Sequence, residues 1–396
     1  MKETISARKD KCNICESNNW LNLPDPVKSH SVTTSGKIVK QPLGKSLCSK
    51  CGFVQRNRFL FMGHSEYYQE DYASYYERPG TEEYHRKRYQ GLVEWMSKYL
   101  PDTHKFKTVL DVGCGQGWMM DAMLSRYPGI EIGGIEPSRH NAAIAIRKGY
   151  PIVETKIEQS TVSDTYDLVY SNNVLQHIND AREFLSNMKM RLNKHGVIIV
   201  TCPDCSRPSI DLLWSDHNYS FLPEHLLNIG YELGFKTAYV AQSNYNPSIP
   251  PAQLFLLTNN PGYSETELAK GQTPVRDINH DYRKKVEYLL SFIKLNDYLA
   301  QKISGFSTVY NFGASYWTSV IAAYCPDYWK RVEACVIDTH DNVTEFMGKR
   351  IVELTELKDK DQVAMVLGTT PTGHDWLAKR LHEYASIIRW DKFSQY

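Results

Sequence analysis

Leu110-Asp-Val-Gly-Cys-Gly-Gln-Gly117 is the stretch that decides the fold of this chain. A short strand-like run, Thr108–Leu110, precedes its three glycines, and a helix-prone run, Trp118–Ser125, follows them. Glycine suits such a turn because the backbone bends sharply and a ligand can approach it without meeting a side chain. The stretch therefore predicts a strand, a tight ligand-binding turn and the start of a helix.

A carboxylate follows the next strand along the chain. The run Ile130–Ile135 is strand-like and leads into Glu136, which lies 23 residues after Gly113. A carboxylate in that position can hold the two hydroxyls of a ribose. The glycine spacing is Gly-x-Gly-x-Gly, which differs from the Gly-x-Gly-x-x-Gly of dinucleotide-binding proteins.

With Asp111 two residues ahead of Gly113, the stretch resembles motif I of the class I S-adenosylmethionine (SAM) methyltransferases. Two later segments fit that family. Tyr166–His177 resembles its fourth strand and following helix, and Val197–Val200 is typical of a buried strand after a turn at Asn193–Gly196. The resemblance implies an α/β, Rossmann-like core that binds SAM. The alternative is a Rossmann-like sheet that binds NAD or no cofactor.

The residues expected to contact SAM come from several parts of this core. Motif I and the end of the second strand supply five of the eleven, and position alone assigns Ile157 and Glu158 to the adenine. An aromatic-rich segment ahead of the core adds tyrosines, whose rings attract a cation and whose hydroxyls can bind a carboxylate. Those tyrosines alternatively only join the N-terminal module to the core. The full set is Tyr72, Tyr76, Asp111, Gly113, Gly115, Gly117, Glu136, Ile157, Glu158, Asn172 and Asn173.

Composition and length limit the class of protein. A chain of 396 residues should form two or three domains, and 46 Lys and Arg against 45 Asp and Glu leave it almost neutral. That balance gives no support to nucleic acid as a main partner. Because no apolar run reaches about 18 residues and the N-terminus lacks a signal peptide's apolar core, we expect a cytoplasmic protein without a membrane span.

Four segments are expected along the chain. A zinc-binding module occupies residues 1–62 and the SAM domain residues 63–258. A linker rich in Pro, Gly and Asn, followed by a long helix from Asp277, fills residues 259–306. Residues 307–396 repeat an alternation of strands and helices and form a smaller Rossmann-like domain.

The N-terminal cysteines form two pairs. Cys12-x-x-Cys15 and Cys48-x-x-Cys51 can each direct two thiolates at one ion, and together they supply the four sulfurs of a tetrahedral Zn²⁺ site. A redox pair and unrelated buried thiols are the alternatives. With four protein ligands the ion has no open position, so its role is structural. A third pair, Cys202 and Cys205, has no obvious further ligands and is expected to be free thiols.

A four-cysteine module, a SAM domain and a small Rossmann-like domain in this order resemble the sugar C-methyltransferases that act on nucleotide-linked deoxysugars. That family carries a Tyr-His-Glu-His run whose last His is the proposed base beside a keto group. The matching run here is Trp214-Ser-Asp-His217, which keeps the last His, has Asp216 in place of Glu and departs at its first two positions. The resemblance implies that His217 is the base, with Asp216 beside it. His225 and His177 are the alternatives, and an Asp-His pair before a helix also occurs without a catalytic role.

The expected reaction is methyl transfer from SAM to carbon in a nucleotide-activated sugar. In the resembling family the C-terminal domain helps to close the nucleotide-sugar cleft, and here Gly313–Ser315 could receive a phosphate at a helix start. A purely structural C-terminal domain is the alternative.

Three other functions stay open. The first is O- or N-methylation of a sugar or another small metabolite. The second is a zinc-anchored RNA or protein methyltransferase, for which Lys45, Lys50, Arg56 and Arg58 offer a modest basic cluster. The third is a protein that binds SAM without turnover. The sequence leaves monomer and dimer equally open.

Overall fold

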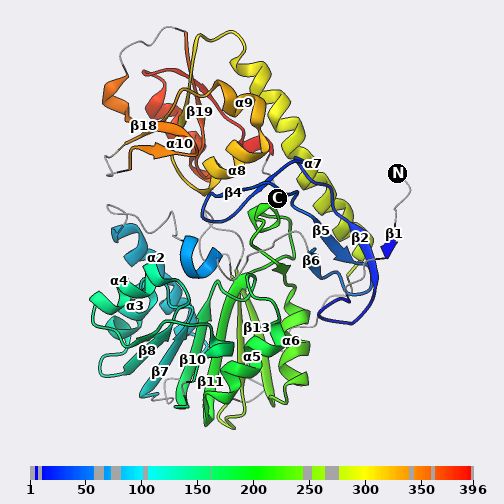
Figure 1. The fold of residues 1–396 in the computed structure, drawn as a ribbon, viewed down its shortest axis with the longest axis vertical. Helices are drawn as coiled ribbons and strands as arrows, with labels where there is room; N and C mark the ends of the chain where they lie inside the picture. Colours follow the sequence, from blue (N-terminus) through cyan, green and yellow to red (C-terminus); the bar gives the residue numbers. More distant parts are fainter. Residues whose placement is uncertain are drawn as a thin grey trace.

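The computed structural model describes residues 5–7, 11–57, 67–72, 82–100, 106–161, 163–243, 252–263, 276–338, 343–357 and 362–393. Figure 1 shows a large sheet with its helices at one end, a smaller sheet with its helices at the other, and the N-terminal strands beside the junction.

The large sheet has seven strands in the order β13-β14-β11-β10-β7-β8-β9. Five neighbouring strands run parallel, and β14 is antiparallel to both of its neighbours. The strand bounds are β7 Thr108–Val112, β8 Glu131–Ile135, β9 Ile152–Val153, β10 Tyr166–Asn172, β11 Leu192–Pro203, β13 Thr237–Ser243 and β14 Ala252–Thr258. This is the α/β, Rossmann-like core that the glycine-rich stretch predicts.

Helices cover both faces of this sheet, because successive strand residues point to opposite sides. Leu168 packs in a core with α2 and α3, whereas its neighbour Val169 packs in a second core with α5 and α6. The helices are α2 Glu82–Ser97, α3 Trp118–Arg126, α4 Arg139–Arg147, α5 Ala181–Met190 and α6 Pro223–Glu232.

The N-terminal module is not a separate unit. Its sheet has the order β1-β2-β5-β6-β12, and β12, Tyr219–Ser220, comes from the segment assigned to the SAM domain. The module strands are β1 Ile5–Ala7, β2 Asn19–Asn22, β5 Lys45–Cys48 and β6 Val54–Arg56, with a hairpin of β3 Ser31–Val32 and β4 Ile38–Val39. The chain just after His217 is therefore held at the edge of the N-terminal sheet.

The C-terminal sheet has six strands in the order β17-β18-β16-β15-β19-β20, and only β17 pairs antiparallel among these described strands. The bounds are β15 Thr308–Phe312, β16 Ala334–Ile337, β17 Glu345–Phe346, β18 Lys349–Glu353, β19 Val363–Leu367 and β20 Ser386–Ile388. The accompanying helices are α7 Ile278–Ile303, α8 Tyr316–Tyr324, α9 Pro326–Arg331 and α10 His374–Leu381.

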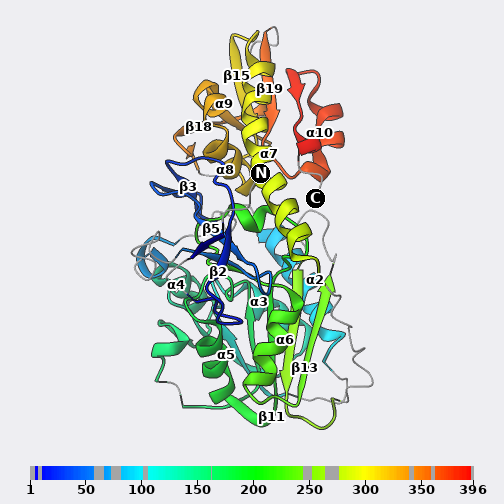
Figure 2. The same ribbon diagram turned by 90° about the vertical axis from the view of Figure 1, so that its right-hand side faces the viewer.

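Helix α7 connects the parts of the molecule. It is the long helix expected from Asp277, whose side chain accepts a hydrogen bond from the His280 N–H and caps its start. Figures 1 and 2 show it running from the C-terminal sheet down beside the N-terminal strands. One apolar core contains Leu47 of β5, Phe292 of α7 and Val366 of β19.

Two local expectations are wrong. Residues 173–180 form turns rather than a helix, and α5 begins only at Ala181, after Asp180 accepts hydrogen bonds from two N–H groups of its first turn. Residues 193–196, expected as a turn, belong to β11, where the pairing with β10 shifts register between Tyr166 and Leu168.

Candidate active site

The glycine-rich turn joins β7 to α3. Gly113, Gly115 and Gly117 all have positive φ, at 79°, 54° and 81°. This left-handed region strains other residues, which explains the repeated glycine. Gly113 is also closely packed, because a Cβ there would lie 2.3 Å from Cγ2 of Val174.

Glu136 is buried at the end of β8 and closes one side of this turn. Its Oε2 accepts a hydrogen bond from the Gly115 N–H at 2.8 Å, and its Oε1 accepts one from the Ser138 N–H at 2.8 Å. A carboxylate has about four acceptor sites, so these two bonds are compatible with further bonds from ligand hydroxyls. The geometry suits the ribose-binding role expected for Glu136.

A cavity of about 530 Å³ opens beyond these residues. All three parts of the molecule contribute to its wall, including Thr34 from the N-terminal module and Tyr316 from α8. Of the expected site residues, the following line it: Tyr72, Asp111, Gly113, Gly115, Glu136, Ile157, Glu158, Asn172, Asn173 and His217. Gly117 and Asp216 lie outside the wall, and Tyr76 lies outside the described residues.

Asp111 is an acid of this wall whose pKa is strongly raised. It is buried in β7, and burial, with a smaller contribution from the charge of Glu136, raises its pKa to about 8. A buried carboxyl is expensive to ionise unless a positive charge lies nearby. A cationic ligand in the cavity would therefore favour its ionised form.

The carboxyl end of β10 carries the two expected asparagines. Asn172 Oδ1 accepts a hydrogen bond from Thr201 Oγ1 at 2.6 Å, while the Asn173 N–H donates to the Thr201 carbonyl at 2.9 Å. Asn173 has a φ of 55°, which asparagine tolerates better than most residues. This bend precedes Val174, the residue that packs on Gly113.

Three further expected residues lie around the cofactor end of the cavity. Ile157 is buried and Glu158 is exposed, in a short 3₁₀ turn at Ile157–Gln159. The carbonyl of Tyr72 accepts a hydrogen bond from Ser138 Oγ at 3.0 Å, which places Tyr72 at the start of α4.

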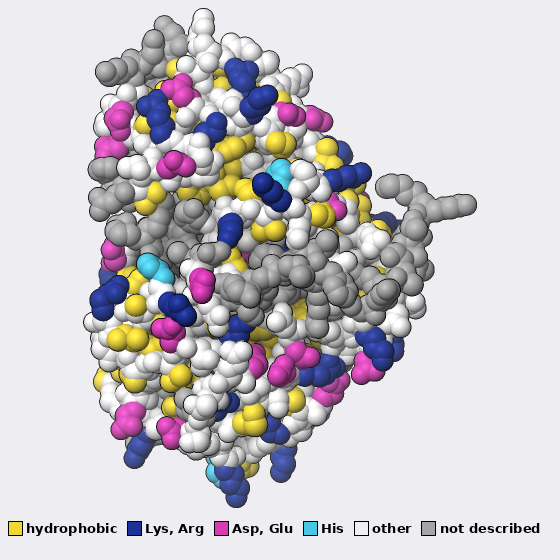
Figure 3. Space-filling model, in the orientation of Figure 1, with side chains coloured by type: hydrophobic (Ala, Val, Ile, Leu, Met, Phe, Trp, Pro, Cys, Tyr) yellow, Lys and Arg dark blue, Asp and Glu magenta, His cyan; other side chains and the backbone are white. Residues whose placement is uncertain are grey.

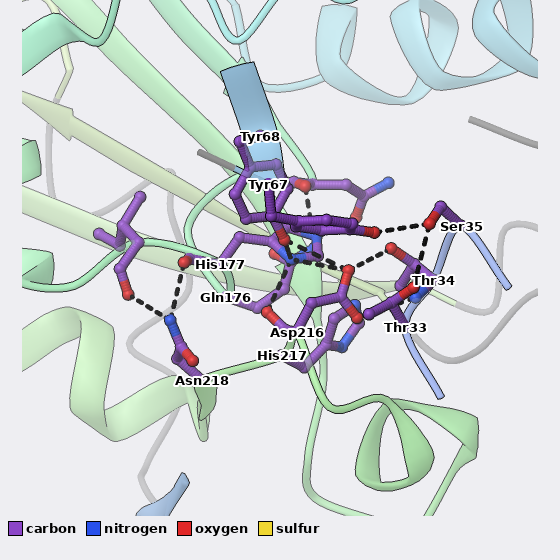
Figure 4. A network of polar contacts seen from close by, with 12 residues as sticks. Thr33, Thr34, Ser35, Tyr67, Tyr68, Gln176, His177, Asp216, His217 and Asn218 are labelled. Atoms are coloured by element: carbon purple, nitrogen blue, oxygen red, sulfur yellow. Dashed lines mark hydrogen bonds and ion pairs between the residues drawn. The ribbon is translucent and has the colours of Figure 1, made fainter. Parts of the chain in front are cut away.

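A polar network that includes Tyr68, His177 and His217 forms another part of the cavity wall (Figure 4). His177 Nδ1 lies 2.7 Å from Tyr68 Oη and 2.9 Å from the Asp216 carbonyl oxygen. Tyr68 Oη in turn donates to Asp216 Oδ2 at 3.2 Å. Burial, reinforced by His217, lowers the pKa of His177 to about 4. His177, expected in a helix after the fourth strand, is therefore a neutral imidazole in a turn at the cavity wall.

The Asp216 side chain makes its hydrogen bonds with Thr34 and Tyr68 rather than with His217. Its Oδ1 accepts a hydrogen bond from the Thr34 N–H at 2.8 Å, and its Oδ2 accepts one from Thr34 Oγ1 at 2.5 Å. Burial alone would raise its pKa, but His177, His217 and the Thr34 bonds lower it below the usual value. Asp216 thus ties the N-terminal module to this loop.

His217 pairs instead with Asp211. Its Nδ1 lies 2.5 Å from Asp211 Oδ1, and its ring packs edge-on against His177 with centroids 4.6 Å apart. Asp211, Tyr68 and Thr34 are the site residues that sequence reasoning missed. No motif spacing marks them, because tertiary contacts bring them to His217 and Asp216.

His225, the first alternative base, is engaged elsewhere. Its Nδ1 accepts a hydrogen bond from the Leu222 N–H at 3.0 Å, and its Nε2 lies 2.8 Å from the Cys51 carbonyl oxygen. It does not line the cavity. This placement favours His217 over His225.

The four N-terminal cysteines meet at one point. The Sγ atoms of Cys12 and Cys51 are 3.6 Å apart, as are those of Cys15 and Cys48, and all four lie within 4.8 Å of one another. Sulfurs at about 2.3 Å from a tetrahedral Zn²⁺ are about 3.8 Å apart, so this donor set fits the ion. All four thiols are free of disulfides, as are Cys202 and Cys205.

Two of the four basic residues considered for RNA binding are buried, so the four do not form one exposed patch. Lys45 and Arg56 are buried and donate hydrogen bonds to the carbonyls of Asp211 and Leu43. Lys50 is exposed, and Arg58 lies outside the described residues. On the face drawn in Figure 3, basic and acidic side chains are interspersed. Within the described part of the chain, no helix has the length and apolar character needed to cross a bilayer.

Known proteins that resemble this chain match it over the Rossmann-like core. Residues 84–234 match a family model described as a methyltransferase domain. Trans-aconitate 2-methyltransferase of Escherichia coli O7:K1 (strain IAI39 / ExPEC) is 34% identical over 99 residues, which is 24% of this chain and 39% of that protein. The chain thus contains a SAM-dependent methyltransferase domain.

Two further relatives are more distant. Ubiquinone biosynthesis O-methyltransferase of Rickettsia canadensis (strain McKiel) is 19% identical over 46% of this chain and 72% of that protein. Malonyl-[acyl-carrier protein] O-methyltransferase of Halalkalibacterium halodurans (strain ATCC BAA-125 / DSM 18197 / FERM 7344 / JCM 9153 / C-125) is 23% identical over 30% of this chain and 48% of that protein. For three of the curated relatives that it matches, including the first and the third named above, the chain spans less than half of the relative's length.

Proposed function

We propose that this protein transfers the methyl group of SAM to a carbon next to the keto group of a nucleotide-activated deoxysugar, with His217 as the base. One observation carries the proposal: nine of the eleven residues expected to hold SAM line the same cavity as His217. SAM supplies a methyl group that is already a good electrophile on its sulfonium. The protein must mainly align the reactants and generate a nucleophile.

The residues of the chain perform the proton transfer. Nε2 of His217 has no hydrogen-bond partner among the described residues, and in this proposal it takes the proton from the acceptor carbon. The C–H electron pair shifts toward the ketone and forms an enolate, whose oxygen needs a hydrogen-bond donor. The enolate carbon then bonds to the methyl group as the methyl–sulfur bond breaks. The products are the C-methylated sugar, S-adenosylhomocysteine and a protonated His217.

Three residues of the cavity wall favour an anionic acceptor that carries a flat nucleotide base. Tyr84 and Arg88 of α2 line the cavity together with Tyr316 of α8. A guanidinium binds phosphate oxygens, and tyrosine rings stack on planar groups. The N-terminal cysteines, we infer, hold a structural Zn²⁺ that stabilises the sheet bearing β12.

The test is calorimetric binding of a panel of nucleotide sugars to protein saturated with S-adenosylhomocysteine. Binding of one nucleotide class, weakened at least about tenfold by Tyr316→Ala with unchanged affinity for S-adenosylhomocysteine, supports the proposal. An absence of binding across the panel contradicts this acceptor class.

A second candidate is O-methylation of a small metabolite, which the names of two O-methyltransferase relatives favour. The two reactions differ in deuterium exchange. C-methylation through an enolate exchanges the hydrogen beside the ketone with solvent deuterium, and His217→Gln abolishes that exchange, whereas the exposed control His195→Gln does not. Turnover without exchange favours O-methylation.

A further inference from the structure

We propose that Asp211 and Lys45 are positioning residues for His217: Asp211 keeps the proton on Nδ1 so that Nε2 stays free as a base, and Lys45 holds and balances Asp211. This inference deepens the proposed function and rests on the assignment of His217 as the base. It gives the N-terminal module a direct part in the active site.

The first step is the contact between Asp211 and His217. Asp211 Oδ1 lies 2.5 Å from Nδ1, and the two residues are 1% and 6% exposed. An ionised carboxylate can only accept hydrogen bonds, so its partner nitrogen must carry the proton. Nε2 is then the unprotonated nitrogen, in a residue that lines the cavity.

The second step is how Asp211 is itself held. Its Oδ2 accepts a hydrogen bond from Ser220 Oγ at 2.5 Å, and its carbonyl oxygen accepts one from Lys45 Nζ at 2.9 Å. Burial alone would raise the pKa of Asp211, but His217, Lys45 and Ser220 lower it. Burial lowers the pKa of Lys45 to about 8, and the charge of Asp211 partly opposes that shift.

The charge of Lys45 therefore acts on the same Asp211 carboxylate that contacts His217, although the hydrogen bond of Lys45 goes to the Asp211 carbonyl. Removing Lys45 should make His217 easier to protonate, whereas removing the charge of Asp211 should make it harder. A general loosening of the site would not shift the two variants in opposite directions.

Other charged and titratable groups surround the pair and stay the same in both variants. His177 and Asp216 interact with His217, while Cys202, Cys205 and Tyr288 interact with Asp211.

The experiment needs no acceptor. Long-range proton–nitrogen NMR spectra of the full-length protein, labelled at histidine with ¹⁵N and saturated with S-adenosylhomocysteine, report the tautomer and titration of each imidazole. His217→Gln assigns the His217 signals. We expect the Nδ1–H tautomer in the wild type. We also expect a titration midpoint lowered by about 1 pH unit or more in Asp211→Asn and raised in Lys45→Met.

Asp204→Asn is the matched control, because Asp204 is a buried carboxylate of the same segment that binds Ser206 and Gln242 rather than His217. Its His217 signals should match those of the wild type. An Nε2–H tautomer in the wild type overturns the proposal, as does an unchanged midpoint in Asp211→Asn or Lys45→Met variants that still bind S-adenosylhomocysteine. If Asp211→Asn does not fold, the sign of the Lys45→Met shift decides alone. A correct tautomer without methylation of any nucleotide sugar would instead contradict the proposed function.

Discussion

At the scale of single residues, the glycine-rich turn combines two different demands. Gly113 needs a positive φ, and it also needs space, because Val174 occupies the position of a Cβ. Val174 follows Asn173, whose own positive φ bends the chain after β10. Two segments about 60 residues apart in sequence thus pack against each other at the cofactor end of the cavity.

Gly113→Ala should weaken binding of S-adenosylhomocysteine by at least about tenfold, because the added methyl displaces Val174. Gly129→Ala is the matched control, since Gly129 also has a positive φ but has nothing within 4 Å of the added methyl. Both variants incur the left-handed strain of about 1–2 kcal/mol. Isothermal calorimetry should show weaker binding for the first variant only. Equal affinities would mean that this packing is irrelevant to the cofactor.

Asp111 provides a pH-dependent prediction. Folding raises its pKa from 3.8 to about 8, mainly through burial, so the folded protein binds the proton more tightly than the unfolded chain. The free energy of unfolding contributed by this group therefore falls as pH rises from about 4 to about 8. Asp111→Asn should be as stable as the wild type near pH 4 and more stable, by about 1 kcal/mol or more, at pH 8. Urea unfolding at both pH values checks this; a constant difference would contradict it.

At the scale of elements, strand β6 of the N-terminal module meets the loop that follows His217. Gln55 of β6 pairs with Tyr219 of β12, and the Arg56 N–H donates to the Asn218 carbonyl at 2.8 Å. On the other side, Arg182 of α5 donates to the carbonyls of Asn13 and Ile14 in the first cysteine turn. Helix α5 of the methyltransferase core thus contacts the first cysteine turn, and β6 of the N-terminal module pairs with the strand that follows His217.

Cys12→Ser should remove about one Zn²⁺ per chain and lower the melting temperature, because the ion contributes to folding of the sheet that holds β12. Cys325→Ser, at a buried cysteine far from the cluster in sequence, should keep the metal content of the wild type. Mass spectrometry of the metal and thermal unfolding measure the two effects. A wild-type protein purified without zinc, and insensitive to chelators, would contradict the assignment.

At the scale of the whole molecule, the three parts share apolar cores. The core that contains Leu47, Phe292 and Val366 draws on the N-terminal sheet, α7 and the C-terminal sheet at once. Buried apolar area contributes about 25 cal/mol per Å², so separating these parts would expose a large unfavourable surface. The C-terminal domain also reaches the cavity through Tyr316, which donates to or accepts from Thr370 Oγ1 at 3.2 Å.

A chain cut after residue 303 should therefore aggregate or melt well below the intact protein, since α7 would expose Phe292 and Leu295. Light scattering and thermal unfolding provide the measurement. A soluble truncated chain with an unchanged melting temperature would show that the C-terminal domain is an independent unit. Tyr316→Ala, which leaves this core in place, is the better variant for acceptor binding.

Local sequence signals determined much of this protein by themselves. Three glycines with helix and strand formers on either side specify the β7–α3 turn, because positive φ is a local property of the backbone. The cysteine spacing likewise brings thiols together in pairs, and apolar periodicity marks α7. Each of these features depends on neighbours within one element or one turn.

Only the tertiary structure decided the rest. It pairs Asp211 rather than Asp216 with His217, inserts β12 into the N-terminal sheet, and buries Lys45 beside the site. These contacts join residues that are distant in sequence or that share no spacing rule, so no local pattern encodes them. These contacts depend on how the sheets and α7 pack, because that packing determines which buried charged side chains lie next to each other.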